Sequence, residues 1–299
     1  MLRIHDPTIW LIGGTEESRH LVSAIAAQPE RIPPTGRLLI SVTTEAARNL
    51  YPTAPWLEVW VGKLTPAIAP QFFQHYAPQA IIDASHPFAV EVSQRAIALA
   101  QQAGVPYLRY ERPGIEAGDR PPAAEPTDTE NDILYCDRLE AALIRDRLIG
   151  QRTLLTLGYR GLSLCQPWHT VAPLFARILP SPVALEAAIA AGFSADRLIA
   201  LRPPISPELE TALWKQWGIT QVITKASGQP GGEATKRAIA AALGVRLVVI
   251  TRPAIAYPAV TTTLADVVDF VWQHLTSLTP TPGSAPAPVR SADNPQASG

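Results

Sequence analysis

The stretch Thr8-Ile9-Trp10-Leu11-Ile12-Gly13-Gly14-Thr15-Glu16-Glu17 decides the fold class of this chain. A short apolar run is followed by two glycines, and then by a threonine and two acidic residues that are typical of a helix start. A strand that turns through glycines directly into a helix predicts the first βα unit of an open parallel sheet. Backbone amides at such a turn can approach a phosphate. The two adjacent glycines lack the third glycine of the usual dinucleotide fingerprint, however, and they equally suit a simple tight turn.

The same alternation of short apolar runs and amphipathic segments continues along the chain, which predicts an α/β fold with parallel sheets. Strands are expected at residues 8–12, 37–42, 57–61, 80–83, 105–109, 153–157, 171–178, 197–201, 221–225 and 246–250. Helices are expected at residues 16–27, 44–50, 66–76, 89–103, 182–191, 207–217, 233–243 and 264–278.

Two segments interrupt this alternation. Residues 114–132 are rich in proline, glycine and acidic residues without apolar periodicity, so they predict a linker or long loop between a first domain, 1–113, and a second domain, 133–278. Residues 279–299 are mostly proline, small and polar residues. They predict a disordered tail, because they cannot bury enough apolar surface to offset the entropy of ordering.

Composition narrows the classes of function. The 299 residues are 47% hydrophobic and 17% charged, with a formal net charge of -1, so neither nucleic acid nor a membrane is an expected partner. Cys136 and Cys165 form no CxxC motif and belong to no cluster of metal ligands, which predicts no metal site and a reducing, cytoplasmic location. A secretory signal and an apolar run of the ~20 residues that span a bilayer are both missing from the sequence.

Ligands of open α/β sheets collect beyond the carboxyl ends of the strands, and two further segments are expected there. Residues 83–89 read Asp-Ala-Ser-His-Pro-Phe-Ala, which concentrates polar groups at the mouth of the first sheet, although helix capping and a half-buried histidine explain them too. Residues 224–232 read Thr-Lys-Ala-Ser-Gly-Gln-Pro-Gly-Gly, an anion-binding loop by composition without being a P-loop. The alternative is an exposed lysine on a flexible turn.

Arginines and hydroxyl groups also follow expected strands. Arg109, Arg112, Arg202 and Arg252 each lie at or just past a strand end, where guanidinium groups suit a ligand with several carboxylates, although each taken alone fits a surface ion pair. The second strand ends in Ser-Val-Thr-Thr, residues 41–44, rather than in the carboxylate that usually binds the ribose of NADH. This favours NADPH, with NADH as the alternative.

Six segments, taken in order, resemble the precorrin-6A reductases of cobalamin biosynthesis over residues 8–253. They are IWLIGGTEESR, IIDASHPFAVEVS, LRYERP, FARILP, VITKASG and VVITRP. The resemblance implies two Rossmann-like domains with the active site in the interdomain cleft. It also implies hydride transfer from NADPH (NADH in some members) to a carbon–carbon double bond of precorrin-6A, or of its cobalt form, which gives precorrin-6B. The tetrapyrrole substrate would carry many acetate and propionate groups.

Residue by residue, the resemblance and the positions at strand ends give three sets of candidates. The candidates for cofactor binding are Gly13, Gly14, Thr15, Glu17, Arg19, Thr43, Ser85, His86 and Pro87. The candidates for substrate binding are Arg109, Arg112, Arg177, Arg202, Lys225, Ser227, Gly228 and Lys236. The candidates for the catalytic proton donor are Asp83, His86 and Lys225.

The sequence differs from the family pattern at two places, and two other classes of function remain as alternatives. Ser85 stands where the family usually has threonine, and residues 203–206, Pro-Pro-Ile-Ser, replace a Gly-Pro-Phe-Ser turn. A nucleotide-sugar or methyl transferase on a similar two-domain frame is one alternative. A non-catalytic module that senses a dinucleotide is the other.

Overall fold

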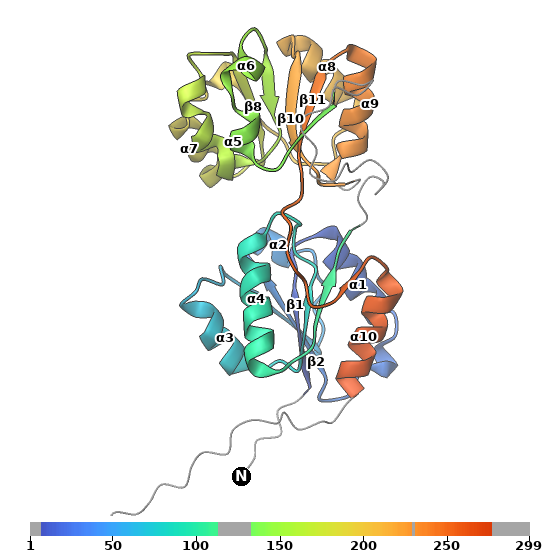
Figure 1. Ribbon diagram of the computed structural model, residues 1–299. Coiled ribbons are helices and arrows are strands. Elements are labelled where there is room, and N and C mark those ends of the chain that lie inside the picture. The colour runs from blue at the N-terminus through green and yellow to red at the C-terminus, as the bar shows by residue number, and fades with distance from the viewer. Residues whose placement is uncertain (1–6, 113–132, 229–230, 277–299) are drawn as a thin grey trace, which may run out of the picture.

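Two six-stranded sheets form the protein, which is described by a computed structural model over residues 7–112, 133–228 and 231–276 (Figure 1). All strand pairs in both sheets are parallel. The first sheet has the order β12(Val260–Thr261), β5(Tyr107–Tyr110), β4(Ala80–Asp83), β1(Thr8–Ile12), β2(Arg37–Val42), β3(Leu57–Val61). The second has the order β6(Ile133–Cys136), β11(Arg246–Ile250), β10(Gln221–Lys225), β7(Thr153–Leu155), β8(Leu174–Ile178), β9(Leu198–Ala200). The predicted fold class is thereby confirmed.

Helices cover both faces of each sheet, as the buried clusters show. The first sheet carries α1(Glu16–Ala26) and α10(Leu264–Thr276) on one face, and α3(Ile68–Tyr76) and α4(Val90–Ala103) on the other. The second sheet carries α5(Leu139–Ala142), α6(Arg145–Leu148), η3(Tyr159–Trp168) and α7(Pro182–Ala190) on one face, and α8(Pro207–Trp217) and α9(Glu233–Leu243) on the other. Shorter helices are η1(Pro29–Arg31), α2(Glu45–Arg48) and η4(Ala195–Arg197).

The domain boundary differs from the prediction at its C-terminal end. Residues 260–276, expected in the second domain, belong to the first: β12 pairs with β5, and α10 buries Val267 and Val271 in the first core beside α1 (Figure 1). The physical reason is the amphipathic face of α10, which needs an uncovered sheet face, and the first sheet offers one beside α1. The chain therefore crosses between the domains twice, and the expected linker and tail lie outside the described residues.

The order of the strands places a switch point in each sheet. In the first sheet, β1 lies between β2 and β4, so the loops that follow β1 and β4 diverge above neighbouring strands. In the second sheet, β7 lies between β8 and β10, and the loops after β7 and β10 diverge in the same way. Because ligands of doubly wound sheets bind at such points, the fold itself selects these four loops for the site.

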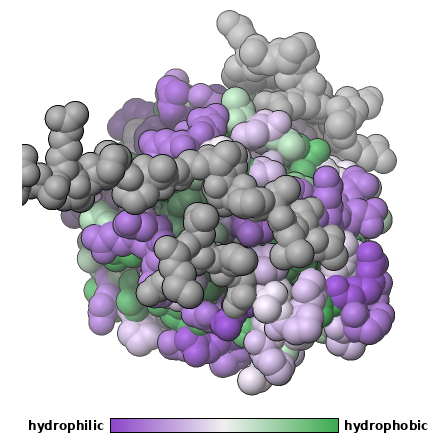
Figure 2. Space-filling view, turned by 90° about the horizontal axis from the view of Figure 1, so that it is seen from below, coloured by the Kyte–Doolittle hydropathy of each residue, from purple (hydrophilic) through white to green (hydrophobic). Residues whose placement is uncertain are grey.

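The surface away from these loops is mixed. Figure 2 views the molecule from below, at the end of the first domain distant from the second, where hydrophilic and hydrophobic residues are interspersed over the visible part. Within the described ranges, no helix combines the length and the apolarity needed to cross a membrane.

Candidate active site

The loop after β1 is built around a tyrosine that the sequence patterns did not indicate. The hydroxyl of Tyr51 accepts the Gly14 N–H at 2.7 Å and lies 2.7 Å from the Ser18 hydroxyl. A Cβ on Gly13 would lie 2.4 Å from the Tyr51 hydroxyl, so Gly13 must be a glycine to admit this ring. Gly14 has a φ of 91°, a backbone conformation that favours glycine. Burial raises the pKa of Tyr51, which keeps its hydroxyl protonated.

Thr15 joins this loop to the neighbouring one across the switch point. Its side chain caps α1 by accepting the Ser18 N–H, and its hydroxyl donates to the Ala84 carbonyl after β4 at 2.7 Å. The hydroxyl of Thr15 is thus not free to donate to a phosphate, a use that its place in the sequence left open. Thr15 instead fixes the spacing between two loops of the site.

Asp83, predicted as a catalytic group, is fully buried. Its carboxylate accepts bonds from the Tyr107 hydroxyl at 2.7 Å, from the Ser85 N–H at 2.9 Å and from Arg109 at 2.9 Å. Burial acts to lower the pKa of Arg109, but Asp83 and Glu111 outweigh it and hold that pKa above its ordinary value. Asp83 and Arg109 therefore form a core ion pair and not groups that face a ligand, which corrects both predictions. Ser85 is buried with them and its hydroxyl accepts from Arg109.

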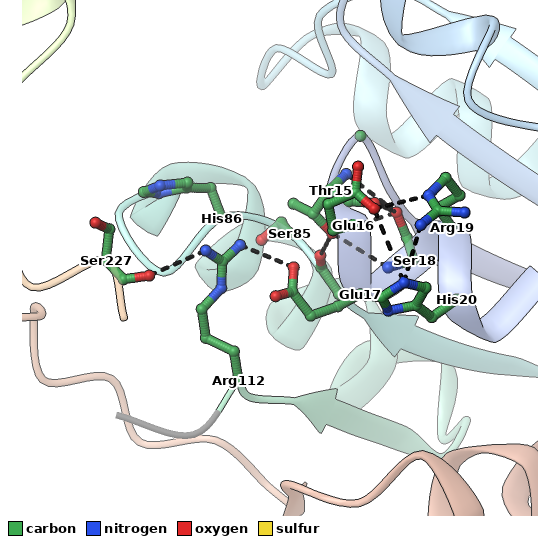
Figure 3. A network of polar contacts seen from close by, with 12 residues as sticks. Thr15, Glu16, Glu17, Ser18, Arg19, His20, Ser85, His86, Arg112 and Ser227 are labelled. Carbon is green, nitrogen blue, oxygen red and sulfur yellow. Dashed lines mark hydrogen bonds and ion pairs between the residues drawn. The ribbon is translucent and has the colours of Figure 1, made fainter. Parts of the chain in front are cut away.

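Arg112 connects the two domains. Its guanidinium donates to the Glu17 carboxylate at 2.8 Å and to the Ser227 carbonyl at 3.0 Å, so it bridges α1 of the first domain and the loop after β10 of the second (Figure 3). Arg252, after β11, makes a second bridge by donating to Glu111 at 2.7 Å. Both guanidinium groups have internal acceptors, so Arg112 is not a free anchor for substrate carboxylates as predicted. Glu17 points toward Arg112 instead of toward a ribose.

His86 lies on the loop after β4, where the two domains meet, with its imidazole near Arg112 and Ser227 (Figure 3). The residue is exposed, although the loops of both domains surround part of its ring. This partial burial lowers the pKa of His86 to about 3, and the positive charges of Arg112 and Lys225 add to the effect. Its Nδ1 accepts the Phe88 N–H at 3.2 Å, which leaves the proton on Nε2. His86 is therefore a neutral hydrogen-bond donor.

Lys225 approaches the same place from the second domain. Its Nζ lies 4.9 Å from the centre of the Phe88 ring, and Phe88 itself packs against the core of the second domain. Burial lowers the pKa of Lys225, and the positive charge of Arg160 lowers it further. No carboxylate pairs with Lys225 among the described residues. His86, Phe88 and Lys225 thus bring the switch points of the two sheets together.

Arg177 and Lys236 do not reach the cleft as free cations. Arg177 pairs with Glu210, and the buried Nζ of Lys236 donates to the Gly231 and Gly232 carbonyls at 2.8 and 3.2 Å. Both were predicted to bind substrate, and both prove to be internal supports of α8 and α9.

The loop after β10 also satisfies its own backbone. The Gly228 N–H donates to the Glu233 carboxylate at 3.0 Å, so the amide expected to bind an anion already binds one from the chain. Pro87 is buried, whereas Arg19 pairs with Glu16 on α1. Thr43 and Arg202 are exposed just after β2 and β9, and their roles in binding cofactor and substrate stay predictions.

Three residues in the loops described above were not indicated by the sequence patterns. Tyr51 contacts Gly14 and Ser18 of another loop, and Phe88 contacts Lys225 of the other domain. A local sequence pattern cannot predict contacts between residues so far apart in the chain. Arg160 follows β7 at the second switch point, where its position after the strand and Gly158 was the available signal.

Together, the two doubly wound parallel sheets, whose β4 and β10 loops contact each other, define a two-domain α/β protein of the dinucleotide-binding fold class. A family model described as "Precorrin-6x reductase CbiJ/CobK" matches residues 8–272. The chain belongs to this reductase family, which makes it an oxidoreductase and favours that class over the transferase and sensor alternatives.

Individual relatives agree with this assignment. The chain is 43% identical to a cobalt-precorrin-6A reductase of Synechocystis sp. over 270 residues, which cover 90% of this chain and 98% of the relative. It is 32% identical to one of Priestia megaterium, over 87% of this chain and 96% of the relative. The solved structure of a CobK precorrin-6A reductase superposes with a TM-score of 0.65 at 24% identity, over 90% of this chain and 97% of that one, and so shares its fold.

Proposed function

We propose that this protein reduces a carbon–carbon double bond of precorrin-6A, or of its cobalt form, to give precorrin-6B with NADPH as the hydride donor. The observation that carries the proposal is the contact of Lys225, at the end of β10, with Phe88 on the loop after β4, where His86 also lies, in a chain of the precorrin-6x reductase family.

The first domain offers a site for the dinucleotide at the N-terminus of α1. The amides of Glu16 and Glu17 lie in the first helical turn, where amides have no partner within the helix, and the exposed Gly14 allows close approach. The Gly14 amide itself is held by Tyr51, so the helix amides would carry the pyrophosphate.

The end of β2 bears on the choice between NADPH and NADH. Thr43 is exposed there, and the carboxylate of Glu45, two residues on, is paired with Arg48 at 3.1 Å. A neutralised strand end tolerates the extra phosphate of NADPH better than a free carboxylate would. This supports NADPH as the cofactor.

When bound, the nicotinamide supplies a hydride to one carbon of the macrocycle. The adjacent carbon must then receive a proton, and Lys225 is the group placed to give it from Nζ. A lowered pKa makes its ammonium a stronger acid. His86, neutral with its proton on Nε2, donates a hydrogen bond into the cleft and transfers no proton. Asp83 takes no part, because no ligand can reach it.

An anaerobic single-turnover experiment tests the proposal. Wild-type protein mixed with precorrin-6A and NADPH should bleach the macrocycle and consume one NADPH per substrate, with NADH reacting more slowly. Lys225→Gln should slow the reduction about 100-fold or more, as expected for loss of a general acid. Lys215→Gln, an exposed lysine in the last turn of α8, is the matched control.

Failure would take recognisable forms. Unchanged macrocycle absorbance together with unconsumed NADPH would contradict the proposal. A fluorescence titration that shows binding of S-adenosylmethionine or a sugar nucleotide in place of NADPH would indicate the transferase alternative. Binding of NADPH without affinity for the macrocycle would indicate the sensor.

Since Cys136 and Cys165 are buried free thiols, we also assign the protein to the cytoplasm.

A further inference from the structure

The cationic side chains in and just after the strands differ in whether a carboxylate of the same chain already pairs with them. Arg109, Arg112, Arg177 and Arg252 each have a carboxylate partner inside the protein. Arg160 and Lys225 pair with no carboxylate in the part of the chain that the structure describes. Uncompensated positive charges that lie together indicate a place for an anion from outside.

The backbone brings these two residues together. Strands β7 and β10 are hydrogen-bonded neighbours at the second switch point, and the Thr156 N–H after β7 still donates to the Ile223 carbonyl of β10 at 3.0 Å. Arg160 lies four residues after Thr156, in the first turn of η3, and Lys225 lies two residues after Ile223, at the end of β10. Arg160 and Lys225 therefore follow neighbouring strands at the same edge of the second sheet, and the positive charge of Arg160 adds to the lowering of the Lys225 pKa.

We propose that Arg160 is a substrate-binding residue that holds a carboxylate of the polycarboxylate macrocycle at the β7–β10 switch point, beside Lys225. Its planar guanidinium can bind a carboxylate with two parallel hydrogen bonds, which fixes the orientation of the group as well as its position. The bound edge of the macrocycle then lies within reach of the Lys225 ammonium. This inference rests on the proposed function for the identity of the ligand, but the anion site itself does not.

Binding of a stable tetrapyrrole tests the site without any turnover. Uroporphyrin carries acetate and propionate groups and is fluorescent, so its Kd can be measured by titration of the full chain. Arg160→Gln should raise this Kd about tenfold, in line with the loss of a charge-assisted hydrogen bond. Arg160→Lys should recover part of the loss, because it keeps the charge without the planar fork. The control is Arg145→Gln, an exposed arginine on α6 that likewise has no ion pair among the described residues and should stay within twofold of wild type.

Kinetics with precorrin-6A give the second measurement. Arg160→Gln should raise the KM for the macrocycle about tenfold and leave the KM for NADPH unchanged. It should also shift the ionisation of Lys225 in the pH profile to higher pH, because a neighbouring positive charge has been removed. If Arg160→Gln matches Arg145→Gln in porphyrin Kd, the anion site is refuted. If Arg160 governs the Kd but wild type reduces no precorrin-6A, the site stands and the proposed function fails.

Discussion

Replacing Asp83 by asparagine is expected to destabilise the first domain instead of removing a catalytic acid. Asp83 is fully buried, and Arg109, at 1% exposure, donates to it at 2.9 Å. Breaking a buried ion pair costs about 3–5 kcal/mol, because the remaining charge has no water to solvate it. Asparagine keeps an oxygen for the Tyr107 hydroxyl, and Arg109 keeps Glu111, so the lower end of about 3 kcal/mol is expected.

Urea denaturation of the wild type and of Asp83→Asn measures this loss through the shift in midpoint at unchanged slope. The matched control is Asp137→Asn, which removes an exposed ion pair with Arg138 and should cost no more than about 1 kcal/mol. The double variant with Arg109→Met completes a cycle whose coupling energy isolates the pair. The kcat of the folded fraction of Asp83→Asn should stay within about threefold of wild type, since a catalytic acid would cost about 100-fold or more.

The opposite pattern would refute a structural role for Asp83. An unfolding free energy within about 1 kcal/mol of wild type, combined with a kcat lowered about 100-fold, would mean that Asp83 faces the reaction and not the core.

Three further predictions concern the loops of the site. Arg112→Met should lower the unfolding free energy by about 3 kcal/mol, because it leaves Glu17 unpaired; an unchanged urea midpoint would contradict the interdomain bridge. Gly13→Ala should cost about 1–3 kcal/mol by thermal denaturation, since its Cβ would meet Tyr51, and Tyr51→Ala should reverse part of that cost. His86→Asn should change kcat/KM by a constant factor between about pH 5 and 8, because the lowered pKa keeps His86 neutral there; a limb near its ordinary pKa of 6.5 that disappears in the variant would argue otherwise. The same pKa shift affects stability, because His86 binds a proton in the unfolded chain at a pH where it stays neutral in the folded chain. The free energy of unfolding of the wild type should therefore fall as the pH drops from 6.5 toward 3, and that of His86→Asn should fall less.

Five central strands could be predicted from the sequence to the residue, whereas β5, β7 and β8 were predicted with bounds that differ by one to three residues. Strands β1, β2, β4, β10 and β11 follow the apolar runs, because strands between two layers of helices must be apolar on both faces. The strands that escaped prediction are β6 and β12, at the outer edges of the two sheets. Edge strands are only partly covered: β6 begins with half-buried residues, and β12 has two residues with Val260 53% exposed. The other two edge strands, β3 and β9, are also only partly buried but were predicted, so partial burial weakens the sequence pattern of an edge strand without always removing it.

The site loops were predictable for a related reason, and their internal partners were not. Glycines, prolines and polar residues at the ends of apolar strands mark the loops after β1, β4 and β10. Whether a cation in such a loop is free depends on residues far away in the sequence. Arg112 finds Glu17 across 95 positions and Arg177 finds Glu210 across 33, and only the fold brings them together. The set of arginines and lysines predicted to bind substrate was therefore too large, because several of them already pair with groups of the protein.

This use of arginine has a consequence for how the two halves of the site are held. Arg112 binds Glu17, the second residue of α1, and also the Ser227 carbonyl, two residues beyond Lys225. A single guanidinium thus fixes the distance between the helix end proposed for the dinucleotide and the lysine proposed as proton donor. Since both of its hydrogen bonds are largely removed from water, neither is readily exchanged for a bond to solvent. If the proposed roles hold, we expect the folded protein to set the alignment of hydride and proton delivery before either ligand binds.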